Sequence, residues 1–183
     1  MSKIFSAEEL HSIVGGKLFK NDWLVSGISI DSRTIKKNEL FIALKAKRDG
    51  NDFIVSAIEN GAKAAIINKI PKDLPKNFPF ILVNNSVEAL YSIAKYSRKK
   101  YKGRVIAITG SVGKTSTKDI LTKMLSNFGV TYSSQKSFNN HLGVPLTLAN
   151  IPKNADFVIC EIGMNSKGEI EPLSKLVAPD VAV

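Results

Sequence analysis

The stretch VIAITGSVGKTSTKDIL, residues 105–121, joins an apolar run to a helix-like segment through a loop that contains glycine. A strand, a glycine loop and a helix in this order form the context in which backbone N–H groups bind phosphate. The loop departs from the Walker spacing G-x-x-x-x-G-K-[ST], because Ile108 occupies the position of the first glycine and the nearest glycine is Gly110. We therefore predict a phosphate-binding loop of another pattern. A structural glycine turn with a surface lysine is the alternative.

In such a loop, Lys114 would reach the β- and γ-phosphates of a nucleotide and the Thr115 hydroxyl would ligate Mg²⁺. Glu161 stands at the end of the apolar run DFVICEIG, residues 156–163. Ligands of open α/β sheets bind outside the carboxyl ends of the strands, so a carboxylate there can share the magnesium ion with Thr115. A surface glutamate at a strand end is the alternative for Glu161. The residues expected to contact the nucleotide are Thr109, Gly110, Ser111, Val112, Gly113, Lys114, Thr115 and Ser116.

The bulk composition is that of a globular protein. Of the 183 residues, 44% are hydrophobic and 23% are charged. The sequence contains neither an apolar run of about 18 residues nor the apolar core of a signal peptide, which favours a cytoplasmic protein without membrane insertion. Cys160 is the only cysteine and lies in an apolar run, so we expect it to pack as a small hydrophobic residue.

The net charge of +10 raises the possibility of a nucleic-acid partner. The basic residues cluster in KAKR, residues 45–48, and in SRKKYKGR, residues 97–104, and neither segment fits a known recognition pattern. Solvated surface lysines and no nucleic-acid partner are the preferred interpretation. A P-loop switch or a nucleic-acid-binding protein remains the alternative from a different class, although the base-reading motif N-K-x-D of GTPases is absent.

The first half of the chain mixes short strands and helices. Residues 6–16 predict a helix with Ser6 as N-cap, Glu9 at the capping-box position and two glycines at its end. A second amphipathic helix is predicted over residues 86–101, with Ser86 as its cap. The remaining elements are read from alternation, apolar runs and helical spacing: strands at 26–34, 39–44, 63–68 and 78–83, and a helix at 53–62.

From residue 104 the pattern changes to repeated strand and helix units, which predicts an α/β fold with a parallel sheet and right-handed crossovers. Strands are expected at 104–109, 130–134, 156–163 and 179–183, helices at 114–129 and 168–177, and a polar loop at 135–145. We place a domain boundary near Gly103, giving domains 1–102 and 103–183. Because the sequence stops on the first residues of an apolar strand, we expect it to be a truncated part of a longer protein.

Three segments resemble the Mur ligases, which build the peptide stem of bacterial peptidoglycan. AITGSVGKTS, residues 107–116, is similar to their loop T-G-[ST]-x-G-K-[ST], which lacks the first Walker glycine. Residues 137–183 resemble the N-N-x-x-G-x-P-x-T-L and E-x-G-M-N-x-x-G-E-I segments of the branch that adds D-alanyl-D-alanine. Residues 31–53 resemble the D-S-R and L-F-x-A-L segments of the UDP-sugar-binding N-terminal domain. Where relatives usually have glycine and histidine, this sequence has Ala46 and Asn51.

The resemblance implies a small α/β UDP-sugar-binding N-terminal domain followed by the first part of a P-loop central ATPase domain, together well under half of a complete enzyme. It implies an ATP-dependent ligase in which ATP and Mg²⁺ activate the terminal carboxylate of UDP-N-acetylmuramoyl-tripeptide as an acyl phosphate. The amine of D-alanyl-D-alanine then attacks that acyl phosphate. A cytoplasmic monomer is implied for the full-length enzyme, and this chain alone is expected to be inactive.

The resemblance also implies roles for individual residues. Lys114 and Glu161 would be catalytic, and Thr115 and Glu161 would hold the metal. The substrate-binding residues would be Asp31, Ser32, Arg33, Asn139 and Asn140, with Asp31 ordering its turn. A surface ion pair is the alternative for Arg33, and turn formation is the alternative for the two asparagines.

Two related ligases remain open at this point. The ligase of the preceding step would carry a T-T-P segment after the P-loop helix, and this sequence has none there. A folylpolyglutamate synthetase-like ligase would share the loop.

Overall fold

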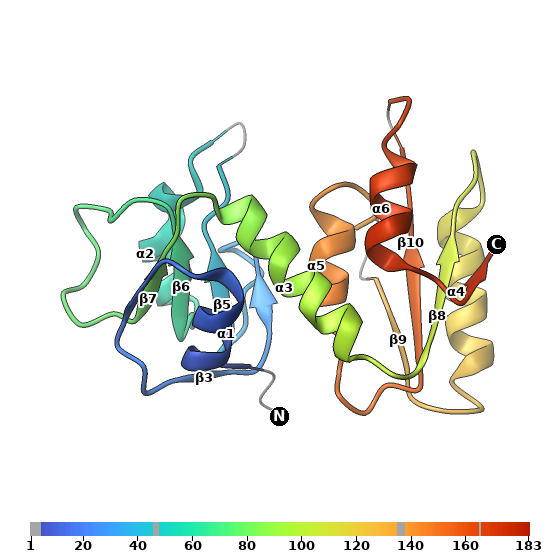
Figure 1. The fold of residues 1–183 in the computed structure, drawn as a ribbon, viewed down its shortest axis with the longest axis horizontal. Helices are drawn as coiled ribbons and strands as arrows, with labels where there is room; N and C mark the ends of the chain where they lie inside the picture. Colours follow the sequence, from blue (N-terminus) through green and yellow to red (C-terminus); the bar gives the residue numbers. More distant parts are fainter. Residues whose placement is uncertain (1–4, 46–47, 135–137, 165) are drawn as a thin grey trace. The chain divides into compact units, whose positions relative to one another are not determined.

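The computed structural model describes residues 5–45, 48–134, 138–164 and 166–183. The chain divides into two compact units, Met1–Ile93 and Ala94–Val183 (Figure 1). The division falls inside helix α3 (Ser86–Lys100), and the proposed boundary near Gly103 follows that helix. Each unit is built around its own sheet.

The first unit contains a five-stranded sheet of order β2-β7-β6-β5-β4. Strands β4, β5, β6 and β7 are parallel, and β2 pairs antiparallel with β7. Their bounds are β2 (Lys17–Phe19), β4 (Ile28–Ser29), β5 (Leu40–Ile42), β6 (Ala64–Ile67) and β7 (Phe80–Leu82). A separate antiparallel pair joins β1 (Phe5–Ser6) to β3 (Leu24–Val25).

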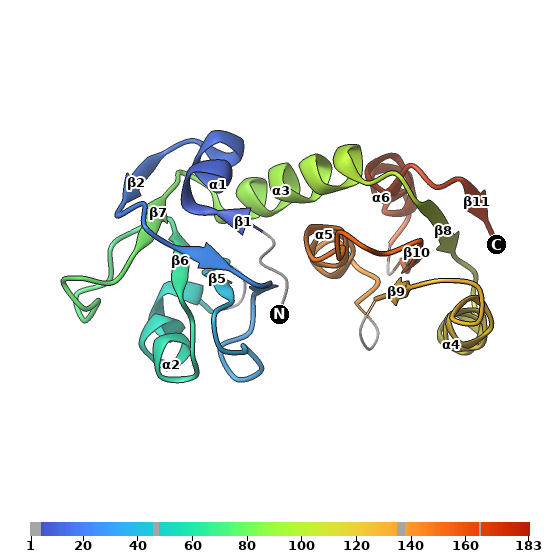
Figure 2. The ribbon, with the colours of Figure 1, turned by 90° about the horizontal axis from the view of Figure 1, so that it is seen from below.

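The helices of the first unit follow from local caps and from burial. The Ser6 hydroxyl accepts a hydrogen bond from Glu9 N at 3.1 Å and starts α1 (Ala7–Val14), as predicted, and Gly15 ends it with φ 68°. Helix α2 (Ile54–Glu59) follows the 3-10 turn η1 (Gly50–Phe53) and buries Ile54 and Ala57 against the sheet. Figure 2 shows α1 and α2 on opposite sides of this sheet.

Helix α3 is present as predicted, but its cap is a different residue. The Asn85 side-chain carbonyl accepts hydrogen bonds from Val87 N at 2.9 Å and from Glu88 N at 3.3 Å. Ser86 is buried, and its hydroxyl has no hydrogen-bond partner among the described residues. The prediction of Ser86 as the cap was therefore wrong by one position, because both residues are good caps and the sequence does not show which of them turns toward the helix.

The second unit holds a parallel four-stranded sheet of order β11-β8-β10-β9. Its strands are β8 (Arg104–Ile108), β9 (Thr131–Ser133), β10 (Phe157–Glu161) and β11 (Val181–Ala182). Helix α4 (Lys114–Leu125) leads from β8 to β9, and α6 (Ile170–Val177) leads from β10 to β11. The alternation of strand and helix thus forms the parallel sheet that the sequence predicted.

The two faces of this sheet carry different helices (Figure 2). On one face, Leu121 and Leu125 of α4 pack against Ile106, Ile108 and Ile159. On the other face, residues of α5 (Gly143–Ala149) and α6 pack with the alternate strand residues, including Val105, Ala107, Val158 and Cys160. This arrangement places the carboxyl ends of β8, β9 and β10 along one edge, beside the N-terminus of α4.

Several elements differ from the prediction. The expected polar loop 135–145 contains the start of α5, whose seven residues are all buried, and its residues 135–137 lie outside the described part, as do Ala46 and Lys47. A fully buried helix has no amphipathic pattern to recognise. Strands β1, β2 and β3 are two or three residues long, which is too short for alternation to show.

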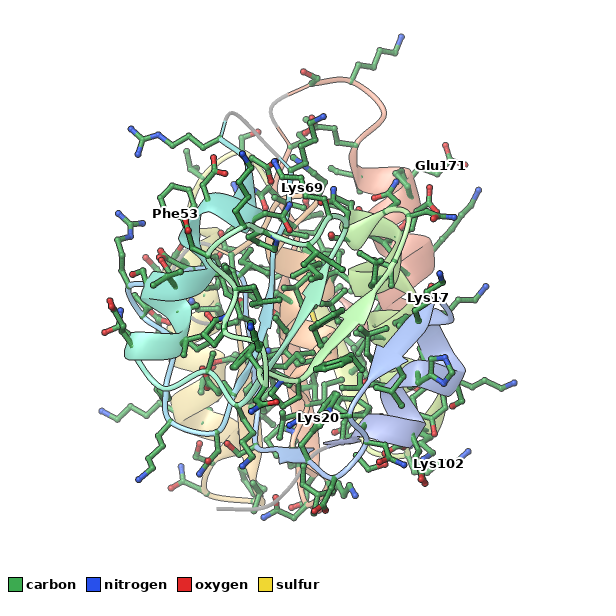
Figure 3. The ribbon with its side chains drawn as sticks, turned by 90° about the vertical axis from the view of Figure 1, so that its left-hand side faces the viewer. Lys17, Lys20, Phe53, Lys69, Lys102 and Glu171 are labelled. Atoms are coloured by element: carbon green, nitrogen blue, oxygen red, sulfur yellow. The ribbon has the colours of Figure 1, made fainter. Side chains whose placement is uncertain are left out.

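The surface carries the exposed charges that composition suggested. Figure 3 shows the chain with its side chains drawn, and the labelled Lys17 and Lys102 are both exposed. Within the described residues, none of the helices has the length and apolar character needed to cross a membrane. Cys160 is buried, as expected for a small hydrophobic residue, and burial raises the pKa of its thiol to about 12.

Candidate functional site

The glycine loop lies between β8 and α4 and has the backbone that a phosphate-binding loop requires. Gly110 has φ 139° and Gly113 has φ 80°, a region that other residues rarely adopt. A Cβ at Gly113 would meet nothing within 4 Å, so conformation rather than crowding explains this glycine. Helix α4 begins at Lys114, directly after Gly113, and the unsatisfied N–H groups of its first turn therefore lie at the loop.

The side chain of Lys114 folds back over this loop. Its Nζ donates a hydrogen bond to the carbonyl oxygen of Gly110 at 2.6 Å. The ammonium group is thus held at the same place as the loop N–H groups, where a bound phosphate would meet both. Val112, at the tip of the loop, is 90% exposed, so the loop has an open side.

Glu161 is the second component of the site. It is the last residue of β10 and only 1% exposed, so the alternative of a surface glutamate is wrong. The Thr115 hydroxyl donates to its carboxylate, with distances of 3.1 Å to Oε2 and 3.3 Å to Oε1. The structure therefore brings together the two residues that were predicted to share a metal ion.

Asn139 completes the surroundings of this carboxylate. Its side-chain Nδ2 donates to Glu161 Oε1 at 2.7 Å, and its main-chain carbonyl oxygen accepts a hydrogen bond from Gly163 N at 2.7 Å. A Cβ at Gly163 would lie 2.8 Å from Asn139 Cγ, so only glycine permits this close approach. Asn139 thereby fixes one oxygen of Glu161, a contact that the sequence did not reveal.

Asn140 has a different use. Its side-chain carbonyl accepts hydrogen bonds from Leu142 N at 3.1 Å and Gly143 N at 2.8 Å, where α5 begins. This is the turn-forming role that was named as the alternative for the asparagines.

The donor set around Glu161 fits a magnesium ion that is held mainly by phosphate and water. Mg²⁺ prefers oxygen ligands and commonly takes only one or two carboxylates from the protein beside the phosphates of its substrate. The Thr115 hydroxyl and the Glu161 carboxylate supply such oxygens at the loop. The described part of the chain has no group of three or more His, Cys, Asp or Glu residues placed to hold a metal alone.

The predicted sugar-nucleotide residues lie in the first unit, in the loop between β4 and β5. The Arg33 guanidinium donates to both oxygens of Asp31, from Nε at 2.9 Å and from Nη2 at 2.7 Å, and its side chain is 84% exposed. Asp31 also accepts a hydrogen bond from Arg33 N at 3.0 Å, so it orders the turn as predicted. Ser32 is buried, and its carbonyl oxygen accepts a hydrogen bond from Asn60 Nδ2 at 3.0 Å. Arg33 thus forms the surface ion pair that was considered as its alternative.

Sequence reasoning did not anticipate a polar network in the next loop of that unit. Asn51 is 1% exposed, and its Nδ2 donates to Asp49 Oδ1 and to Asn68 Oδ1, both at 2.6 Å. Hydrogen bonds from the backbone and side chain of Asn51 lower the pKa of Asp49. The Asp-Gly pair at 49–50 was the available signal, because it commonly marks a turn whose aspartate binds nearby N–H groups.

Comparison with known proteins identifies the family. Residues 24–98 match the model of the Mur ligase family catalytic domain, and residues 108–183 match that of the Mur ligase middle domain. The chain belongs to the Mur ligase family. This Mur ligase chain is 42% identical over 172 residues to the UDP-N-acetylmuramoyl-tripeptide--D-alanyl-D-alanine ligase of Rickettsia prowazekii. The aligned region covers 94% of the chain and 38% of that relative. It is 38% identical over 161 residues to the ligase of the same name from Bacillus subtilis, covering 87% of the chain and 35% of the relative.

Solved structures agree with these relatives. MurF from Acinetobacter baumannii matches this Mur ligase chain with a TM-score of 0.84 and 33% identity, over 97% of the chain and 39% of that protein. MurF ligase from Thermotoga maritima, solved in complex with ADP, matches with a TM-score of 0.68 and 32% identity, over 88% of the chain and 37% of that protein. The Mur ligase chain therefore spans about two fifths of the length of the proteins it resembles.

Proposed function

We propose that this Mur ligase chain binds Mg²⁺ and ATP at the α4 loop, as part of an ATP-dependent ligase. The proposed reaction joins D-alanyl-D-alanine to UDP-N-acetylmuramoyl-tripeptide in peptidoglycan precursor synthesis. The observation that carries the proposal is the contact between the Thr115 hydroxyl and the buried Glu161 carboxylate at the glycine loop. The names of the relatives support the choice of substrates.

In this proposal, the residues of the loop offset a concentration of negative charge. The terminal carboxylate of the tripeptide attacks the γ-phosphate of ATP, forms an acyl phosphate and releases ADP; the amine of the dipeptide then displaces phosphate. The first attack brings like charges together. Lys114 and the N–H groups of residues 110–115 would hold the triphosphate while charge moves to the β–γ bridging oxygen. When bound, Mg²⁺ would supply additional positive charge beside Thr115 and Glu161.

Two domains would divide the work. We assign residues 1–102 to UDP-sugar binding and residues 103–183 to the nucleotide site. For Arg33 to bind the uridine diphosphate, its guanidinium would have to release the Asp31 carboxylate and take a phosphate in its place. Carboxylate and phosphate compete here, because both accept hydrogen bonds from the same N–H groups of the guanidinium. Asn139, which contacts Glu161, would bind substrate beside that carboxylate. We also propose that the complete enzyme is a cytoplasmic monomer.

The test of the nucleotide site is calorimetric titration of the chain with Mg-ATP. Replacing Lys114 with alanine is expected to weaken binding at least about tenfold, since a hydrogen bond to a charged group contributes about 1.5–3 kcal/mol. Lys123→Ala is the matched control, because Lys123 lies on the same helix and is exposed. Equal affinities for the wild type and Lys114→Ala would refute the assignment of the loop.

The substrates are tested separately with the full-length ligase. Mass spectrometry of the product should show the addition of a dipeptide to UDP-N-acetylmuramoyl-tripeptide. Addition of one amino acid, or of glutamate to a folate, would instead identify a different member of the family.

A further inference from the structure

Lys118 is a buried lysine on α4 to which the proposed function assigns no role. Among the described residues, the buried charged side chains are Lys118, which is 3% exposed, and Glu161, which is 1% exposed. Burial of an ammonium group costs several kcal/mol and is rare for lysine. Both of these charges occur in the second unit, although most charged residues of the chain lie on its surface.

The geometry places the Lys118 ammonium at the same edge of the sheet as Glu161. Its Nζ donates to the carbonyl oxygen of Ser134 at 3.2 Å. Ser134 directly follows the end of β9, and its N–H donates to Ile159 O at 3.2 Å on the neighbouring strand β10. Glu161 ends β10 two residues after Ile159, and adjacent strands lie about 4.8 Å apart. The ammonium is therefore next to the strand ends where Glu161 emerges.

The position of Lys118 on α4 also places its side chain near Glu161. Thr115 and Lys118 are three residues apart, so they share a face of α4, and this is the face from which Thr115 contacts Glu161. Side chains on a helix lean toward its N-terminus, so Lys118 reaches back toward the glycine loop. Asp119, whose Oδ1 lies 3.4 Å from Lys118 Nζ, has a side chain that is 68% exposed, so its charge is shared with solvent.

From these placements, we propose that Lys118 is a second lysine of the nucleotide site, whose buried positive charge stabilises an anionic oxygen arriving at the carboxyl ends of β9 and β10. The inference rests on the proposed function and deepens it. The oxygen belongs either to the γ-phosphate of ATP or to the terminal carboxylate of the acceptor, since both bring negative charge to Glu161. A fixed charge in a water-poor position acts more strongly on such an oxygen than a solvated one does.

The test uses Lys118→Met, which keeps an unbranched side chain of similar length and removes the charge, with Lys123→Met as the exposed control on the same helix. Four ligands are titrated into the chain: Mg-ATP, Mg-ADP, UDP-N-acetylmuramoyl-tripeptide and the same tripeptide with its terminal carboxylate amidated. The melting temperature of each variant is measured in parallel. Lys118→Met also removes the ammonium donor of the Ser134 carbonyl oxygen, so a purely structural role of Lys118 would lower the melting temperature and all four affinities together.

Two results support the inference and identify the oxygen. A loss of about tenfold in Mg-ATP affinity with Mg-ADP within about twofold assigns the charge to the γ-phosphate. The same loss for the tripeptide, but not for its amide, assigns the charge to the acceptor carboxylate. The inference is overturned if all four affinities stay within about twofold of the wild type, or if they fall together with the melting temperature, as a structural role predicts. Failure of the wild-type chain to bind Mg-ATP would instead remove the proposed function, and this inference with it.

Discussion

Replacing Gly163 with alanine should disturb Glu161 without touching it. The new Cβ would lie 2.8 Å from Asn139 Cγ, 2.9 Å from Nδ2 and 3.0 Å from Oδ1. Gly163 is not among the positive-φ residues, so the backbone itself accepts alanine and the crowding of the Asn139 amide is the main consequence. That amide donates to Glu161 Oε1 at 2.7 Å, and it must move away to relieve the contact.

The size of the effect follows from the bond that is lost. A hydrogen bond to a charged group contributes about 1.5–3 kcal/mol, and Glu161 has little solvent to replace it because it is 1% exposed. We expect Gly163→Ala and Asn139→Ala each to lower the free energy of unfolding by roughly this amount. Weaker positioning of the carboxylate should also reduce Mg-ATP affinity by about tenfold, which corresponds to about 1.4 kcal/mol.

A double-mutant cycle separates this mechanism from a general packing defect. Urea unfolding and Mg-ATP titration are measured for Gly163→Ala, Asn139→Ala and the variant that carries both. In the double variant the alanine at 139 leaves room for the new methyl group, so it should be no less stable than Asn139→Ala alone. Additive losses in the double variant would show that Gly163 does not act through Asn139, and the reasoning would fail.

The remaining predictions concern caps and titrating groups. Asn85→Ala should cost about 1 kcal/mol of unfolding free energy because it removes the α3 cap, whereas Ser86→Ala should cost almost nothing; urea unfolding of both variants checks this. Burial raises the pKa of Tyr101 to about 12, so wild-type stability should fall between about pH 10 and 12 as the unfolded chain alone loses the proton, and Tyr101→Phe should remove that fall in melting scans. Hydrogen bonds from Asn51 lower the pKa of Asp49 in the folded protein. The ionised Asp49 therefore contributes to the free energy of unfolding above about pH 4, and this contribution is lost as the pH falls through the lowered pKa of the folded state. Melting temperatures of wild type and Asp49→Asn should therefore converge at acidic pH, and a constant difference would contradict the cause.

The parts of the fold that sequence reasoning predicted are those with a local physical signature. Ser6 and Gly15 mark both ends of α1, and the alternation of strands and helices after residue 104 predicts the parallel sheet. Helix α5 carries no such signature, because all its residues are buried and its sequence therefore lacks a polar face. The caps of α3 show a similar limit, since Asn85 and Ser86 have nearly equal propensities and packing decides between them.

The candidate site shows the same division. The glycine loop, Lys114 and Thr115 are contiguous, and their order along the chain was enough to predict their place at the start of a helix. The contact between Asn139 and Glu161 joins residues 22 positions apart and depends on Gly163 for space, which no local pattern reveals. Lys118 looked like any other helical lysine, because its burial is decided by the position of β9 against α4.

The position of Cys160 gives the chain an intrinsic reporter of opening. The thiol is 1% exposed in the middle of the parallel sheet, and it is the only sulfhydryl that the sequence contains. A disulfide reagent or a maleimide can reach it only when α5 and α6 move away from the face of the sheet that holds Cys160. The rate of labelling therefore measures how often this part of the core becomes accessible. Nucleotide bound at the adjacent loop, as proposed above, should slow that rate, and no engineered probe is needed.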